Sequence, residues 1–428
     1  MTEILPNTNR LIIGTRSFLS SLGATAASTF VGIYAVMIGA GAAEMGWLQS
    51  SVNSISNGGQ ILWGKLSDKT GRRKGFLALG SIILAFLWFL MPLASQPVYL
   101  IIVYSLVALF GSMITVNWFS LIADLSDTSV RGKFLAFINN VSSVGTIISL
   151  IAMIFLFNGN SRRDIEIPFY LAALTYVISA AMMLFLKEDR HRPQFKYSMA
   201  KTLRHIKEDE NFYPYFKATN VQGFFWSMAW PMFPITIVSL MNFNLSDVAI
   251  LTIVSLSVSI IVMTFLGRYN DRKERPPLIF LNRIMLSLIP VLYAFSNSLF
   301  LFVLVEIYSG FLGALQNIVM NSYLLDIIPN SRRAEYISII NGFNGLVYLL
   351  GALTGGYLLE FTESFLPLGK ALMAAYLVVF IGRFATSFFF LKLREPEKKG
   401  RTPIALFSIL YRQKMPGSPS GGTIRMKD

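Results

Sequence analysis

A chain of 428 residues that is 54% hydrophobic and 14% charged, with a mean hydropathy of +0.56, is not composed like an ordinary soluble domain. It has a net charge of +14 and no cysteine, and its only histidines are His191 and His205. These counts exclude disulfides, thiolate metal sites and histidine metal clusters, and no cofactor is expected.

Long apolar runs dominate the sequence. A helix needs about 20 mostly apolar residues to cross a bilayer. The runs are continuously apolar, unlike the shorter alternating strands of a membrane barrel. The sequence therefore predicts an all-α membrane protein with twelve transmembrane helices, at residues 15–37, 44–63, 75–94, 98–123, 133–157, 167–186, 213–240, 245–266, 277–297, 299–325, 336–359 and 369–391.

Lysines and arginines concentrate in alternate loops, whereas the opposite loops contain only Arg162, Arg163 and Lys370. Short basic loops stay in the cytoplasm, so both termini are predicted to be cytoplasmic in a multi-pass protein of the cell membrane. The positive charge is expected to contact anionic lipid headgroups on that side. Nucleic acid is not an expected partner, because the bases are dispersed among loops instead of forming one patch.

The chain contains an internal repeat. The segment LIADLSDTSVRGKFLAFINN aligns with YLLDIIPNSRRAEYISIING, and GKLSDKTGRRK aligns at nearly the same spacing with GRYNDRKERP. Because six is an even number, two six-helix units have the same orientation in the membrane, which is a parallel repeat. The predicted organisation is an N-terminal six-helix bundle at 1–186, a cytoplasmic linker at 187–212, a C-terminal six-helix bundle at 213–392, and a basic, largely disordered cytoplasmic tail at 393–428.

The loop GKLSDKTGRRK between the second and third predicted helices places one acid among five bases. It resembles the corresponding loop of major facilitator superfamily transporters, through Gly64, Leu66, Asp68, Lys69, Gly71, Arg72 and Arg73. With the twelve helices and the central linker, this resemblance covers almost the whole chain. It implies two six-helix bundles related by a pseudo-two-fold axis, and transport of a small solute by alternating access.

The motif residues are predicted to form a conformational latch that comprises Gly64, Asp68, Gly71, Arg72, Arg73, Asp124 and Arg131. Gly64 is expected to allow another helix to approach closely, and Gly71 to occupy a turn with positive φ. We expect Asp68 to meet the N-terminus of the eleventh helix or Arg131. Arg72 is expected to meet Asp124. The alternative is that the basic residues serve only to fix topology.

Two helices are rich in small residues. The second contains Asn53, Asn57, Gly58 and Gly59, and the eleventh contains glycines at 342, 345, 351, 355 and 356. Small residues permit close helix contact. The pattern is compatible with gate helices that slide and equally with static packing.

Polar side chains inside predicted helices are candidates for a substrate or proton site. The resemblance directs attention to the first, fourth, seventh and tenth helices, which surround the central cavity in the superfamily. The candidate residues are Glu306, Gln316, Asn317, Gln222, Trp226, Asn117, Trp118 and Tyr34. Glu306 is the only acid well inside a predicted helix. It is a candidate for proton coupling or for recognition of a cationic group, and the alternative is a structural partner of Arg283 or Arg383.

The seventh predicted helix has further features. Pro231 and Pro234 are expected to kink it, and helical spacing places Gln222, Trp226 and Trp230 on one face. Arg283 and Arg383, in the ninth and twelfth helices, are expected to be structural or to extend toward the interface.

Two departures from the superfamily pattern affect the expected mechanism. Val107 stands where many proton-coupled antiporters have an arginine four residues before Gly111, and the fifth helix lacks their proline. Drug–proton antiport is therefore not favoured over transport of a sugar, an organic acid or a peptide, or over passive transport.

The expected function is secondary active transport of a small organic solute, coupled to protons. There is no GxxxxGK[ST] loop for ATP-driven transport, and no nucleophile, base and metal constellation for an enzyme. The alternatives are a solute-binding sensor or receptor derived from a transporter, and a facilitated-diffusion uniporter. The expected oligomeric state is a monomer.

Overall fold

The computed structural model describes residues 7–125, 131–157, 162–186, 199–272, 274–329 and 332–396, and within this part of the chain the structure is helical without strands. The all-α prediction is therefore confirmed. The helices are α1 (Asn7–Met37), α2 (Ala42–Thr70), α3 (Lys74–Leu90), η1 (Met91–Leu93), α4 (Pro97–Leu125), α5 (Arg131–Leu156), α6 (Arg162–Phe185), α7 (Met199–Glu208), α8 (Phe212–Met228), α9 (Met232–Ile235), η2 (Thr236–Leu240), α10 (Leu245–Arg272), α11 (Arg275–Ser287), α12 (Ile289–Phe295), α13 (Leu299–Ile327), α14 (Arg333–Glu363), α15 (Leu368–Ser387) and η4 (Phe388–Lys392).

Each of the twelve predicted transmembrane helices has a counterpart. Eleven helical segments of the described chain are long and apolar enough to cross a membrane. The remaining one, α2, fails this criterion because it carries polar residues such as Asn53, Asn57 and Gln60. Nevertheless, α2 has 29 residues and packs between α4 and α14 within the bundle. The neighbouring helices α4 and α14 can therefore shield the polar face of α2 from lipid. Together with the eleven apolar helical segments, this makes the chain an integral multi-pass membrane protein.

The seventh and ninth transmembrane segments are interrupted. In the seventh, α8 ends at Met228 and α9 begins at Met232 after Pro231, which confirms the expected break. In the ninth, α11 and α12 meet at Leu288, two residues before Pro290. Proline lacks an amide hydrogen and clashes with the preceding turn, so both interruptions follow from the local sequence.

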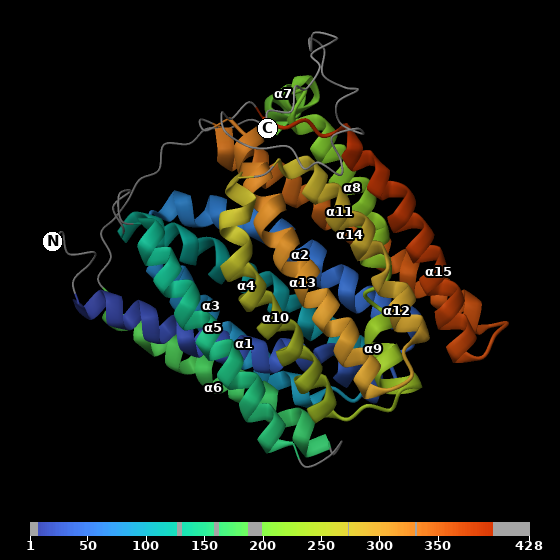
Figure 1. Cartoon of the computed structure of the whole chain (residues 1–428). Coiled ribbons are helices and arrows are strands. Elements are labelled where there is room, and N and C mark those ends of the chain that lie inside the picture. Colours follow the sequence, from blue (N-terminus) through green and yellow to red (C-terminus); the bar gives the residue numbers. More distant parts are fainter. Residues whose placement is uncertain are drawn as a thin grey trace, which may run out of the picture.

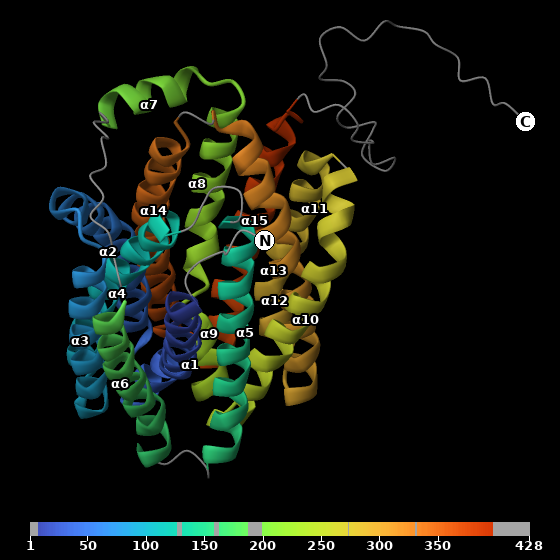
Figure 2. The ribbon, with the colours of Figure 1, turned by 90° about the vertical axis from the view of Figure 1, so that its left-hand side faces the viewer.

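The helices form two groups, and the contacts between the groups are concentrated on a few helix pairs (Figures 1 and 2). Within the first group, α1 packs on α5 and α6, and α3 on α4 and α6. Within the second, α8 packs on α14 and α15, and α10 and α11 on α13. The main contacts between the groups are α2 with α14 and α5 with α10. Figure 2 shows that α7 lies across one end of the second group.

The two ends of the molecule differ in how they pack. We call the end that carries residues 64–74 and α7 the basic end, and the other the opposite end. From the middle toward the opposite end, one apolar cluster joins both groups, including Phe30 and Met45 of the first with Met228 and Phe302 of the second. Toward the basic end, the described apolar residues form two separate clusters, one in each group. The groups are therefore packed together at the opposite end and divided at the basic end.

Glycines allow the close approach of α2 to α14. A Cβ atom on Gly356 would lie 2.6 Å from the carbonyl oxygen of Ala42 and 2.9 Å from Cα of Gly46. Farther along the same interface, a Cβ on Gly345 would lie 2.8 Å from Cβ of Asn57. Near the opposite end, the indole nitrogen of Trp47 donates to the hydroxyl of Tyr357 over 3.1 Å. The small residues of the second and eleventh segments thus serve packing between the groups.

The loop after α2 adopts the conformation that its glycine predicts. Gly71 caps α2 with φ of 63°, so positive φ is confirmed, and its amide donates to the carbonyl of Ser67 over 3.0 Å. Arg73 pairs with Asp68 over 2.6 Å and donates to the hydroxyl of Ser67 over 2.6 Å. The loop is therefore held by its own side chains.

Two expectations for the latch differ from the geometry of the described conformation. The described ion pair of Asp68 is with Arg73 and not with the N-terminus of the eleventh segment, because the two groups are divided at this end. Gly64 is not at a close helix contact, since a Cβ there would meet only Cγ2 of Val116 at an ordinary 3.6 Å. The side chains of Asp124 and Arg131 lie outside the described residues, so their expected pairings stay predictions. Arg72 is exposed.

Gly71→Ala is expected to lower the stability of the protein by about 1–2 kcal/mol, because an L-residue is disfavoured in the left-handed region. Gly75→Ala is the control. Gly75 lies in α3 without positive φ, and nothing lies within 4 Å of an added Cβ, so this change should be neutral or slightly stabilising. The measurement is thermal unfolding of both purified variants in one detergent. Equal melting temperatures for the two variants would contradict the prediction.

The linker contains a surface helix, as its charge predicts. In α7, Ile206 is buried in the apolar cluster of the second group, while Arg204 and Glu208 are exposed. The hydroxyl of Thr202 donates to Glu335 at the start of α14 over 2.8 Å. The linker helix is thereby attached to the second group. Residues 187–198, and residues 397–428 of the expected disordered tail, lie outside the described part.

Candidate functional site

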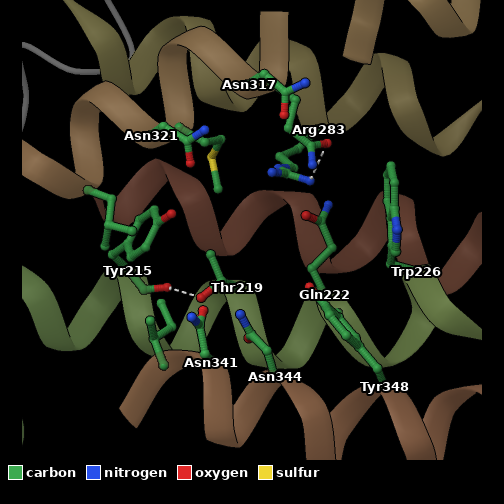
Figure 3. Close-up of a pocket in the computed structure, with 15 residues that line it drawn as sticks. Tyr215, Thr219, Gln222, Trp226, Arg283, Asn317, Asn321, Asn341, Asn344 and Tyr348 are labelled. Atoms are coloured by element: carbon green, nitrogen blue, oxygen red, sulfur yellow. Dashed lines mark hydrogen bonds between the residues drawn. The ribbon is translucent and has the colours of Figure 1, made fainter. Parts of the chain in front are cut away.

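A polar cavity lies among α8, α11, α13 and α14 and extends from near the basic end of these helices to about their middle (Figure 3). Its volume is about 220 Å³. We call it the amide cavity, because six of its lining residues carry side-chain amides. The polar and aromatic lining residues are Gln222, Gln316, Asn317, Asn321, Asn341, Asn344, Tyr215, Thr219, Trp226, Arg283 and Tyr348. All come from the second group of helices.

The depth of the amide cavity follows from helix geometry. Gln316 lies eleven residues before the end of α13, and Asn344 eleven residues after the start of α14. At 1.5 Å per residue, both are about 16 Å from the basic end of their helices, close to the centre of a hydrocarbon core of about 30 Å. Asn317 and Asn321 are exposed. The cavity therefore offers polar groups at mid-membrane depth.

Arg283 contributes a cation to this cavity. Its side chain is 7% exposed, and its Nη1 donates to Oε1 of Gln316 over a long 3.3 Å. Its Nε has no hydrogen-bond partner among the described residues. The guanidinium carbon lies 5.9 Å from the ring centroid of Trp226. Arg283 was expected to be structural or to extend toward the interface. Its place on the cavity wall could not be predicted, because helical spacing alone does not show which face of α11 lines a cavity.

Gln222 and Trp226 are brought together in the amide cavity, as their spacing predicts (Figure 3). Gln222 donates to the hydroxyl of Ser387 over 3.1 Å, which fixes its side chain. Trp230 does not follow them, because α8 ends at Met228 and helical periodicity no longer applies. Instead, its ring packs edge-on against Tyr348 at 5.2 Å between centroids.

Glu306 lies in a different cavity, of about 320 Å³, formed by α1, α9, η2, α10, α12 and α13. We call it the carboxyl cavity. The hydroxyl of Tyr293 donates to Oε1 of Glu306 over 2.8 Å, and Ser255 also bonds to this carboxyl group. Thr29 brings the first group of helices to the same cavity. The described ion pairs do not join Glu306 to Arg283 or Arg383, so the structural alternative is not supported.

The predicted grouping of Glu306 with Gln316 and Asn317 is therefore corrected. Glu306 and Gln316 are ten residues apart on α13, which is about 15 Å along the helix axis. Gln316 and Asn317 line the amide cavity, whereas Glu306 lines the carboxyl cavity nearer the opposite end. Two separate polar sites follow one another along the same helix.

The candidates of the first group lie outside both cavities. Tyr34 is 1% exposed and its hydroxyl donates to the carbonyls of Pro92 and Ala94, at 3.1 and 2.7 Å. Asn117 is fully buried and donates to the carbonyl of Met113 over 2.8 Å. The ring of Trp118 lies under the guanidinium of Arg16 at 4.0 Å. In this conformation bundle contacts enclose Tyr34 and Asn117 and partly bury Trp118, so these three residues serve packing.

Arg383 has the structural environment expected of it. It donates to the carbonyls of Phe225, Trp226 and Leu286, at 3.2, 2.7 and 3.5 Å. The first two carbonyls belong to the last turn of α8. Carbonyl groups in this turn have no amide donor within the helix, because the helix stops at Met228. A cation at a helix C-terminus is also favoured by the helix dipole. Arg383 thus stabilises the break in the seventh segment.

Comparisons with known proteins agree with this architecture. The sequence profile described as "Major Facilitator Superfamily" matches residues 16–218 and again residues 215–416. The class H tetracycline resistance protein of Pasteurella multocida is 28% identical over 102 residues, which are 24% of this chain and only 25% of that relative. The crystal structure of the nucleoside transporter NupG has a TM-score of 0.71 at 16% identity and covers 90% of this chain and 98% of its own.

A second solved structure, a D-xylose–proton symporter, has a TM-score of 0.69 at 14% identity and covers 92% of this chain and 99% of its own. At such identities, the two solved structures support the fold alone. The profile carries the assignment, because its two matches together cover nearly the whole chain. The chain belongs to the Major Facilitator Superfamily, a family of membrane transporters and not of enzymes.

Proposed function

We propose that this protein is a secondary active transporter that carries a small organic solute across the membrane by alternating access. The observation that carries the proposal is a polar cavity at mid-membrane depth in a molecule packed shut at one end and divided at the other. Alternating access requires a solute site that is reached from one side at a time. Two similar solved structures, named as a nucleoside transporter and a D-xylose–proton symporter, support the same activity.

The basic end is the proposed cytoplasmic end. Short loops rich in lysine and arginine stay inside, so the described conformation is the inward-facing one, with both termini cytoplasmic. The cell membrane is the proposed location, with anionic lipid headgroups against the basic loops. A monomer is sufficient for this mechanism, because the amide cavity is built within one chain.

The latch is proposed to exchange partners during transport. In the described conformation, Asp68 pairs with Arg73 in its own loop. When the two groups of helices close at the basic end, the carboxyl group of Asp68 would come within reach of the N-terminus of α14. The side chain of Asp68 is 49% exposed, whereas that of Arg73 is only 8% exposed, so the carboxyl group can leave this pair from its solvent side.

Glu306 is the proposed proton carrier. It is a carboxyl group within a transmembrane helix, bonded to the neutral hydroxyls of Tyr293 and Ser255 rather than to an arginine. A charged group without a counterion is costly inside the bilayer, so protonation would relieve this cost. The carboxyl cavity also contains Thr29 from the first group of helices. Movement between the groups would therefore change the surroundings of Glu306.

The test is transport by the purified full chain in liposomes that contain a pH-sensitive dye. Radiolabelled nucleosides, sugars and organic acids are added one class at a time, with and without an imposed pH gradient. We expect one class to accumulate inside the liposomes and to move protons with it. Solute movement without proton flux would establish a uniporter. Saturable binding without any movement would establish a sensor and overturn the proposed transport.

A further inference from the structure

We infer that the amide cavity binds a small organic anion, whose carboxylate or phosphate group pairs with Arg283. The inference rests on the proposed function and names the class of solute that the site takes. It is carried by the position of a buried cation on the wall of a cavity that otherwise offers neutral groups.

A guanidinium group keeps its charge under physiological conditions. Placing such a charge inside a membrane protein is costly unless it is paired or faces water or a ligand. The residues that line the amide cavity include no aspartate or glutamate. The charge of Arg283 is therefore not neutralised by the cavity wall.

The acids nearest along α13 have other partners. Asp326, at the basic end of the helix, pairs with Arg275. Glu306 bonds to Tyr293 in the carboxyl cavity, about 15 Å from Gln316 along the helix. Neither is available as a counterion for Arg283 in this conformation, so an anion from solution would supply the missing charge.

Arg383 provides an internal comparison. Both arginines are buried within the second group, at 7% exposure for Arg283 and 2% for Arg383. Arg383 donates to three backbone carbonyls and lies outside the lining of the cavity. Arg283 has one long bond to Gln316 and an Nε without a partner in the described structure. The bonds of Arg383 therefore stabilise the fold, whereas Arg283 keeps N–H donors that can bind a ligand.

The rest of the wall suits an anionic molecule with hydroxyl groups. Figure 3 shows Asn317 beside Arg283, and Asn341 and Asn344 across the cavity from α13. Amide groups both donate and accept hydrogen bonds, so they can contact hydroxyls and the remaining oxygens of an acid group. An arginine fork binds carboxylate or phosphate with two parallel bonds. Trp226 offers an apolar ring beside the charged group.

The absence of cysteine from the whole chain allows a direct test. Asn317→Cys places one thiol on the exposed rim of the amide cavity. Its reaction rates are measured in nanodiscs with two small methanethiosulfonates, the anionic sulfonatoethyl reagent and the cationic trimethylammonioethyl reagent. Because Arg283 attracts the anion and repels the cation, we expect the anionic-to-cationic rate ratio to fall about tenfold in the added variant Arg283→Gln.

Two further variants test whether the change in the rate ratio comes from the charge of Arg283 itself. Lys217→Gln removes one charge from an exposed position on α8 that does not line the cavity, and it should change the ratio less than twofold. Arg283→Lys keeps the charge and should preserve the ratio. An unchanged ratio in Arg283→Gln, or a thiol at 317 that reacts with neither reagent, would overturn the inference.

The class of acid is tested by protection of the thiol at 317 from neutral methyl methanethiosulfonate. D-Gluconate, D-glucose 6-phosphate and D-glucose carry a carboxylate, a phosphate and no charge on similar hydroxylated skeletons. Protection by gluconate alone assigns a carboxylate, and protection by glucose 6-phosphate alone assigns a phosphate. In either case Arg283→Gln should weaken protection about 10- to 100-fold. Equal protection by neutral glucose contradicts the inference.

These results are independent of the transport assay. A fall in the rate ratio without solute movement in liposomes would sustain the anion site and refute the proposed transport. Conversely, transport of a neutral solute that continues unchanged in Arg283→Gln would sustain the transporter and refute the anion site.

Discussion

Glu306→Gln is expected to abolish proton flux driven by the solute while leaving the exchange of labelled solute across the membrane intact. Glutamine has almost the same size and can still accept the hydrogen bond that Tyr293 donates over 2.8 Å. It cannot bind and release a proton in the physiological range. Removal of a positioned proton-transfer group typically costs about 100-fold or more in rate, so the flux should fall at least that far.

Solute exchange should persist because the two cavities are separate. Exchange of labelled for unlabelled solute needs the loaded transporter to reorient but needs no net proton movement. Glu306 is about 15 Å along α13 from Gln316 of the amide cavity. The measurement compares dye-reported proton flux with solute exchange in the same liposomes. Glu360→Gln, at an exposed position on α14, is the matched control and should change neither.

Two outcomes would contradict this prediction. Proton flux at the parental rate would show that another group carries the proton. If the variant elutes like the parent in size-exclusion chromatography but loses both proton flux and solute exchange, Glu306 would be assigned to solute binding or to the conformational change. The expected separation of the two rates is therefore specific to a proton carrier.

Much of the fold can be predicted from the sequence because the bilayer imposes strict conditions on it. Helix length, continuous apolarity and basic loops are local properties, so the twelve segments could be placed without knowledge of their packing. The helix break at Pro231 and the positive φ of Gly71 also depend on one residue each, and both are confirmed. The second segment shows the limit of hydropathy, because α2 is polar along part of its length.

The candidate site was less predictable because it depends on which helix faces meet. Tyr34 and Asn117 have the composition of site residues, but neighbouring helices enclose them. Arg283 was expected to be structural or to extend toward the interface, although it lies on the cavity wall. Spacing along one helix correctly grouped Gln222 with Trp226, yet it could not show that Glu306 and Gln316 belong to different cavities. Such relations are fixed by tertiary contacts and not by local sequence.

Gly355→Ala is expected to lower the stability of the protein by about 3 kcal/mol. The added Cβ would overlap the carbonyl oxygen of Met228 and lie 2.7 Å from its carbonyl carbon. These are backbone atoms at the end of α8, so the helix itself must move, and overpacking of this kind typically costs about 1–3 kcal/mol. Gly342→Ala is the matched control on the same helix, since nothing lies within 4 Å of its added Cβ.

The measurement is the fraction of monodisperse protein that remains after heating, for both variants and the parent. Gly342→Ala should equal or slightly exceed the parent, because alanine is favoured over glycine within a helix. Equal losses of monodisperse protein in both variants would show that the loss of stability arises within α14. That result would contradict the predicted role of the contact between Gly355 and α8. The same displacement should also weaken solute binding in Gly355→Ala, because α8 carries Thr219, Gln222 and Trp226 on the wall of the amide cavity. One glycine contact would then be seen to set both the stability of the helix pair and the geometry of the site.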